Sequence, residues 1–121
     1  MNHNFKNLII WKLGMDITRM IYQVSKQFPS DEKYGLTNQM RRCAVSIPSN
    51  IAEGCGLGTN SQLMHYLDIA LGSSCELETQ LMLAHDFGYL EKASYDEIIK
   101  LLGEFQKRTR TFKSTLQPQV R

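Results

Sequence analysis

The sequence has almost none of the patterns that build β-sheets or disulfide frameworks. No segment alternates apolar and polar residues over the length of a strand, and no Asn-Gly or Asp-Gly pair marks a hairpin. The three cysteines, Cys43, Cys55 and Cys75, contain no Cys-x-x-Cys pair. An odd number of cysteines at long spacings argues against a zinc knuckle or a redox pair, and it predicts three buried free thiols.

Long apolar runs are also missing. No stretch approaches the ~18 consecutive apolar residues of a membrane span. The run from Leu8 to Trp11 is too short for the core of a signal peptide. We therefore expect a cytoplasmic protein that does not enter a membrane. The 121 residues correspond to a single domain, residues 1–121, and 42% hydrophobic residues are enough for an apolar core.

The motifs of common catalytic sites do not occur. The sequence has no Gly-x-Ser-x-Gly motif, and "GCGLG" matches neither a dinucleotide fingerprint nor a phosphate-binding loop. Four-helix bundles can hold di-iron centres, but the Glu-x-x-His motif of those centres is absent. His65 and Asp68, three apart on one helix face, leave a metal-dependent enzyme as the weaker alternative. We expect a non-enzymatic protein without a cofactor or metal.

Positive charge is absent from the middle of the chain. Residues 43–91 carry six acidic residues and no Lys or Arg, a net charge of −6, whereas residues 1–42 and 92–121 each carry +4. Three arrangements explain such segregation. The charges neutralise each other within one fold, they meet across a subunit boundary, or a basic face binds an anionic partner.

Helical periodicity is present four times. It predicts helices over about residues 7–27, 37–54, 60–87 and 95–116. The predicted core stripe of the first helix includes Leu13 and Met20, and that of the third helix is Leu63, Leu67, Ala70, Ser74, Leu77, Leu81 and Ala84. Their expected end signals are an N-cap at Thr37, capping boxes at Thr59–Gln62 and Ser94–Glu97, and a left-handed glycine at Gly54 or Gly56. Short connections favour an all-α, antiparallel up-down-up-down four-helix bundle. Two helical hairpins packed at a larger angle are the alternative.

A proline interrupts the second predicted helix. Pro48 has no N–H to donate to the Ala44 carbonyl, and a proline inside a helix costs about 3 kcal/mol. The apolar register nevertheless continues from Ala44 to Ile51, so we predict one helix that is kinked at Pro48. The polar side chains expected to satisfy the freed backbone groups are Ser46, Ser49 and Asn50.

Two further residues occupy unfavourable helical positions. Glu53 lies at the C-terminal end of the second helix, where its charge opposes the helix dipole. It is either solvated or held by a partner, and we expect a partner. Gly72 lies inside the third helix, where glycine costs roughly 1 kcal/mol relative to alanine. Close approach of another helix would offset that cost, either within the bundle or at a subunit contact.

Basic residues gather at the start of the second helix and along the fourth. They are candidate contacts to the phosphates of RNA or DNA. The set consists of Arg41, Arg42, Lys107, Arg108, Arg110 and Lys113. Charged helix faces are commonly just solvated, and no motif of an RNA-binding module occurs. A nucleic-acid-binding accessory protein is therefore the alternative to a protein that binds other proteins.

The order of residues in one segment is more specific than its composition. "YGLTNQMRRCAVSIPSNIAEG" at residues 34–54, with "YLDIALGSSCELETQL" and "FGYL" further along, resembles the family of 23S rRNA intervening-sequence proteins. The similarity spans about residues 5–115. The residues of these motifs that we interpret as a structural signature are Pro48, Asn50, Glu53, Gly54 and Gly72.

The resemblance implies a left-handed antiparallel four-helix bundle that assembles as a homopentamer. A similar bundle is the accessory protein of diversity-generating retroelements, which works with a reverse transcriptase and nucleic acid. Leu57 stands where the family commonly has a basic residue, which weakens an anion-binding role for that loop. We expect a self-assembling interaction protein that associates with RNA or an RNA-handling protein. The acidic third helix of one subunit would face a basic first or fourth helix of the next.

Overall fold

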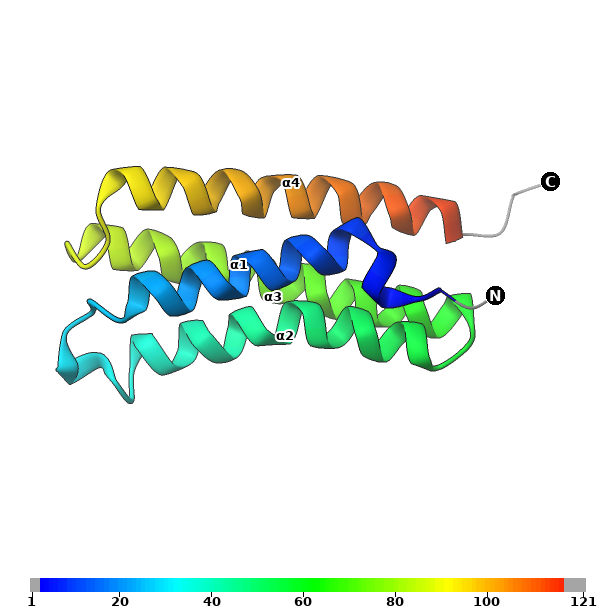
Figure 1. Ribbon diagram of the computed structural model, residues 1–121, viewed down its shortest axis with the longest axis horizontal. Coiled ribbons are helices and arrows are strands. Elements are labelled where there is room, and N and C mark those ends of the chain that lie inside the picture. Colours follow the sequence, from blue (N-terminus) through cyan, green and yellow to red (C-terminus); the bar gives the residue numbers. More distant parts are fainter. Residues whose placement is uncertain (1–2, 117–121) are drawn as a thin grey trace.

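The computed structural model describes residues 3–116, and within them the chain forms four α-helices and two short 3-10 helices without a strand. The helices are η1 (Phe5–Asn7), α1 (Ile9–Ser25), η2 (Ser30–Glu32), α2 (Leu36–Gly56), α3 (Asn60–Asp86) and α4 (Lys92–Leu116). Consecutive α-helices run antiparallel along an elongated body, and α1 packs against both α2 and α4 (Figure 1). This is the predicted all-α four-helix bundle rather than two hairpins at a large angle.

Each helix buries one stripe of residues spaced three and four apart. On α3 the whole predicted stripe is buried, and its residues are Leu63, Leu67, Ala70, Ser74, Leu77, Leu81 and Ala84. These meet stripes of the other helices that include Ile17, Ile47, Ile51, Leu102 and Phe105. Removal of this apolar surface from water stabilises the bundle, at roughly 25 cal/mol per Å². Leu13 and Met20, predicted for the core stripe of α1, are only half-buried.

The helix ends lie within three residues of the predicted ones, but two of the caps differ. The N-cap at Thr59 is confirmed, since the Gln62 N–H donates to Thr59 Oγ1 at 3.2 Å, and Gln62 Oε1 accepts from the Thr59 hydroxyl at 2.8 Å. The predicted box at Ser94 is wrong, because α4 already begins at Lys92. The predicted N-cap at Thr37 is also wrong. Instead the Leu36 N–H donates to Glu32 Oε1 at 3.1 Å, so Glu32 of η2 caps α2.

The left-handed glycine after α2 is Gly58, with φ +88°, and not Gly54 or Gly56. The reason is that α2 continues through Gly56. Gly54 lies instead where α2 and α3 cross. A Cβ on Gly54 would stand 2.9 Å from Tyr66 Cβ and 3.3 Å from Leu63 Cα, so a side chain there would push the two helices apart. The role of Gly54 is therefore close packing.

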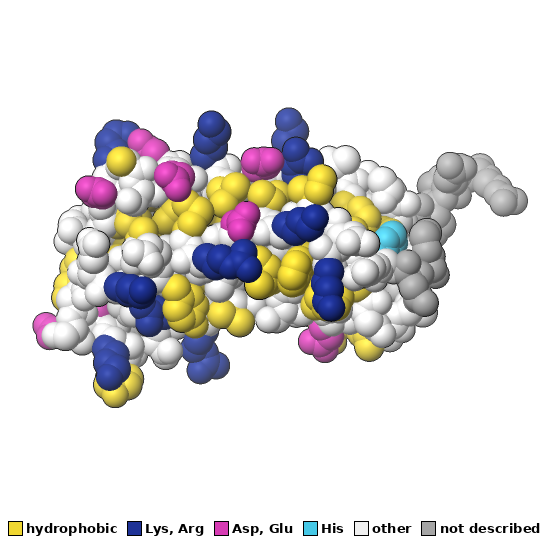
Figure 2. Space-filling view, viewed as in Figure 1, with side chains coloured by type: hydrophobic (Ala, Val, Ile, Leu, Met, Phe, Trp, Pro, Cys, Tyr) yellow, Lys and Arg dark blue, Asp and Glu magenta, His cyan; other side chains and the backbone are white. Residues whose placement is uncertain are grey.

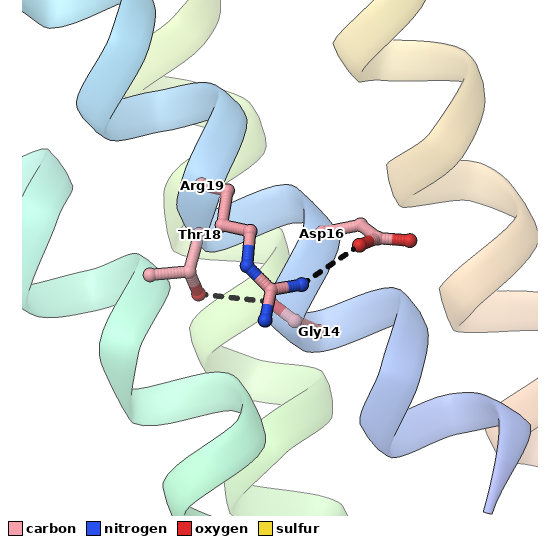
Figure 3. A network of polar contacts seen from close by, with 4 residues as sticks. All are labelled: Gly14, Asp16, Thr18 and Arg19. Atoms are coloured by element: carbon pink, nitrogen blue, oxygen red, sulfur yellow. Dashed lines mark hydrogen bonds and ion pairs between the residues drawn. The ribbon is translucent and has the colours of Figure 1, made fainter.

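Pro48 lies inside α2, which continues through it as one helix. The carbonyl of Ala44, which Pro48 cannot serve, accepts a hydrogen bond from Thr18 Oγ1 of α1 at 3.0 Å. Thr18 Oγ1 also lies 2.8 Å from the Gly14 carbonyl oxygen, on the side of α1 that faces α2, so its single hydrogen is shared between the two carbonyls (Figure 3). We expected side chains of α2 to donate to the Ala44 carbonyl, and this expectation is wrong, because the donor comes from the facing helix α1. The kink at Pro48 stays a prediction.

The close contact of α1 with α2 at the proline depends on a second glycine. A Cβ on Gly14 would stand 3.1 Å from Ile47 Cγ2 and 3.3 Å from Pro48 Cδ. Gly14 therefore lets α1 approach the proline ring, and that approach places Thr18 within reach of Ala44. The proline, the glycine and the threonine form one local arrangement.

Candidate interaction surfaces

Arg41 is used within the bundle. Its Nε donates to Ser25 Oγ at 2.8 Å, and its guanidinium lies over the Tyr22 ring, 4.7 Å from the ring centroid. Its Nη2 also donates to the Tyr22 carbonyl at 3.4 Å. These contacts tie α2 to the last turn of α1, where a cation is favourable. Arg42, its neighbour, is exposed and belongs to a small notch between α2 and α3.

Two of the predicted basic residues on α4 pair with carboxylates. Lys113 forms an ion pair with Asp68 of α3. Arg108 Nε lies 3.0 Å from Glu104 Oε1, one turn earlier on the same helix. Part of the charge segregation seen in the sequence is therefore neutralised within the fold. Asp68 and Lys113 lie on different helices, so this pairing could not be predicted from their spacing in the sequence.

Lys107 and Arg110 are exposed, and neither forms an ion pair with any residue between 3 and 116. Arg42 is the third predicted residue of this kind. It lies on α2, which packs against α1 and α3, whereas Lys107 and Arg110 lie on α4. The structure thus divides the six predicted residues among separate places on the bundle and does not gather them into one patch.

An open groove of about 720 Å³ runs between the start of α1 and the end of α4. Its apolar lining includes Leu8, Ile9 and Phe112, and its charged lining residues, which we call its rim, are Glu104, Lys107 and Arg108. Figure 2 shows a band of apolar side chains between α4 and α1 with both basic and acidic side chains beside it. We call this surface the α1–α4 groove.

A contrasting surface lies on the outer side of α3. Residues at 69, 72, 76, 79 and 83 follow one another by three and four positions, so they lie on one line along the helix. We call this line the α3 outer face, and its residues are Ile69, Gly72, Glu76, Thr79 and Leu83. All five are exposed. The face contains apolar and acidic side chains and no basic one.

Gly72 lies on the α3 outer face with open space around it. A Cβ built there would meet no atom within 4 Å in the described part of the chain. A helix crossing inside the bundle is therefore not the reason for this glycine, and that expectation is wrong. A subunit contact stays the other explanation.

The remaining signature residues have structural surroundings. Asn50 Nδ2 donates to the Ser46 carbonyl at 2.7 Å and to Ser46 Oγ at 2.9 Å. Ser46 Oγ and Ser73 Oγ lie 2.8 Å apart, which links α2 to α3. The Glu53 carboxylate beside the Tyr66 hydroxyl raises the pKa of Tyr66. Glu53 is exposed, and the expectation that a partner holds its carboxylate stays a prediction.

The cysteines differ from one another. Burial, and secondarily the charge of Glu76, raises the pKa of Cys43 to about 12, and its Sγ donates to the Ser73 carbonyl at 3.0 Å. Burial also raises the pKa of Cys55. Cys75 is exposed, so the prediction that all three thiols are buried is wrong for this one. It lies at the edge of α3 rather than on its core stripe.

Metal-ligating side chains are not brought together. Among residues 3–116 no group of three His, Cys, Asp or Glu side chains could hold a metal ion. His65 packs edge-on against the Tyr66 ring at 5.2 Å, and Asp68 pairs with Lys113. None of the described helices combines the length and the apolar character that a membrane span requires.

The fold defines an all-α four-helix-bundle protein. Its distinctive features are two exposed surfaces, the α3 outer face and the α1–α4 groove. The model of the family described as 23S rRNA-intervening sequence protein matches residues 6–111. The chain belongs to this family.

A solved structure shares the fold. It is a protein with unknown function from the S23 ribosomal protein family of Bacteroides thetaiotaomicron, with a TM-score of 0.79 and 20% sequence identity. The similarity covers 88% of this chain and 96% of that one. A comparison with curated proteins gives no match.

Proposed function

We propose that this protein is a non-enzymatic, self-assembling helical bundle that serves as an interaction module in the cytoplasm. The assembly implied by the family resemblance is a homopentamer. Its three cysteines are free, which suits a reducing compartment. The observation that carries the proposal is the distribution of exposed apolar side chains relative to charge.

Exposed apolar side chains concentrate in the part of the chain that has no basic residue. In the described residues nine large hydrophobic side chains are exposed, and six of them lie between residues 45 and 87. The six are Val45, Leu57, Ile69, Met82, Leu83 and Phe87. Apolar surface of this kind marks interaction sites when it forms patches, and complementary charge selects the partner. A surface that combines apolar and basic side chains would complement this apolar and acidic part of the chain.

Sedimentation velocity tests self-assembly. Untagged protein at micromolar concentration in moderate salt should sediment as an oligomer. Its dissociation should increase with salt, because charge complementarity between exposed groups is screened. A monomer under these conditions contradicts the proposal.

Association with RNA or DNA is the second candidate. The observation in its favour is that Arg42, Lys107 and Arg110 are exposed and have no ion-pair partner among residues 3–116. Such residues can contact phosphates and release counterions. A protein partner that handles RNA would serve the same role, and the name of the family is compatible with both.

Titration of structured RNA and duplex DNA at several salt concentrations tests this candidate. Affinity should fall steeply with salt, and the triple change Arg42→Glu, Lys107→Glu and Arg110→Glu should remove it. Lys33→Glu, a reversal at an exposed residue between η2 and α2, is the matched control and should leave most of the affinity. An affinity that does not change with salt concentration, or an absence of binding at low salt, would argue against phosphate contacts.

A further inference from the structure

We infer that the α3 outer face of one copy of this chain binds the α1–α4 groove of the next copy, head to tail. This inference rests on the proposed self-assembly and names the two surfaces that meet. Both surfaces are exposed on every copy of the chain. Both are apolar, but the α3 outer face carries an acid and the α1–α4 groove carries bases.

The α3 outer face has the shape of a helix–helix contact without a partner helix. Ile69 and Leu83 are 38% and 41% exposed, and they lie toward the two ends of the face. Between them, the open space around Gly72 permits the close approach of another backbone. Glu76 lies at the centre, where its contact is a 3.4 Å hydrogen bond from Gln80 Nε2. Glu76 also lines the notch between α2 and α3 together with Arg42, but it forms no ion pair among residues 3–116, so its charge is available to a cation of another copy.

The α1–α4 groove offers the complementary surface. Ile9, in its lining, is 55% exposed, which is a large apolar area to leave in water. Phe112 extends the apolar lining, and Lys107 on the rim has no ion-pair partner between residues 3 and 116. An apolar helix face with a central acid thus fits an apolar groove with a basic rim.

Pairing of like surfaces is less favourable. Two α3 outer faces would bring Glu76 close to its own copy, and two grooves would do the same with Lys107. Because the favoured contact joins two different surfaces, it is heterologous. Each copy then uses both surfaces, and the chain of contacts closes into a ring when the rotation between copies allows it.

Two variants that each lose one surface test the inference. The face variant carries Gly72→Trp and Glu76→Lys, and the groove variant carries Ile9→Glu and Lys107→Glu. All four positions are exposed, so circular dichroism should show full helicity for both. Each variant alone should sediment as a monomer. An equimolar mixture should form a heterodimer, since the intact face of one meets the intact groove of the other.

The control is Gly103→Trp on α4. Gly103 is exposed, a Cβ there meets nothing within 4 Å, and it lies outside both surfaces. This variant should assemble like the unmodified chain. If the unmodified chain is a monomer, the proposed function fails together with the inference. If it assembles but the two variants also assemble, or their mixture stays monomeric, self-assembly stands and the inferred surfaces are overturned.

Discussion

Gly54 and Gly72 are both helical glycines, and they face opposite environments. At Gly54 a Cβ would press on Tyr66 and Leu63 of α3, whereas at Gly72 it would meet nothing within 4 Å. The inner glycine is explained by the fold of one chain. The outer one reduces helix stability without any compensating contact in the described part of that chain. The comparison indicates that α3 serves two purposes, a core on one side and a surface kept open on the other.

The largest expected effect comes from filling the inner position. Gly54→Val should lower the free energy of unfolding by about 2–3 kcal/mol, because its side chain would overlap Leu63 and Tyr66. Gly72→Ala should raise it by about 0.5–1 kcal/mol, through better helix propensity alone. Urea denaturation at a concentration where the chain is monomeric measures both. Equal changes at the two positions would remove the contrast between inner and outer sides.

The α1–α2 contact at Pro48 gives a second, smaller effect. Thr18→Val should lower the free energy of unfolding by about 1–2 kcal/mol, because the Ala44 carbonyl loses its donor. In a Pro48→Ala background the restored N–H at residue 48 serves that carbonyl, so the effect of Thr18→Val should shrink by about 1 kcal/mol. A double-mutant cycle by urea denaturation measures this coupling. Strict additivity would show that Thr18 does not compensate for the proline.

The two adjacent arginines of α2 provide the smallest contrast. Arg41→Ala should lower the free energy of unfolding by about 1 kcal/mol, since the contacts to Ser25 and Tyr22 are lost. Arg42→Ala should change stability by less than about 0.5 kcal/mol, because Arg42 is exposed. Thermal unfolding of the two variants side by side checks this. A larger loss for Arg42 would mean that its contacts matter more to the fold than those of Arg41.

Periodicity was enough to predict the core of α3, because a repeat of three and four residues defines a helix face without any knowledge of its neighbours. The contacts between helices were not predictable in this way. Thr18 serves the Ala44 carbonyl from 26 residues away. Nothing in the local sequence around Pro48 points to Thr18, so local side chains were expected instead.

The caps show the same limit. The N-cap at Thr59 belongs to a local motif, and it was predicted correctly. The cap of α2 is Glu32, a residue whose other carboxylate oxygen accepts a hydrogen bond from the Tyr89 hydroxyl at 3.0 Å. Its position is therefore set from two loops at once. The candidate surfaces likewise depend on exposure, and helical periodicity alone did not place Cys75 on the exposed side of α3.

The short connection between α2 and α3 bears on how the chain folds. Only residues 57–59 separate the two helices, and these helices share the most extensive contact in the described chain. Closing so short a loop loses little chain entropy, and its contacts are close in sequence. We expect the α2–α3 hairpin, whose helices pack closely at Gly54, to form early in folding. It would then serve as the template on which α1 and α4 dock.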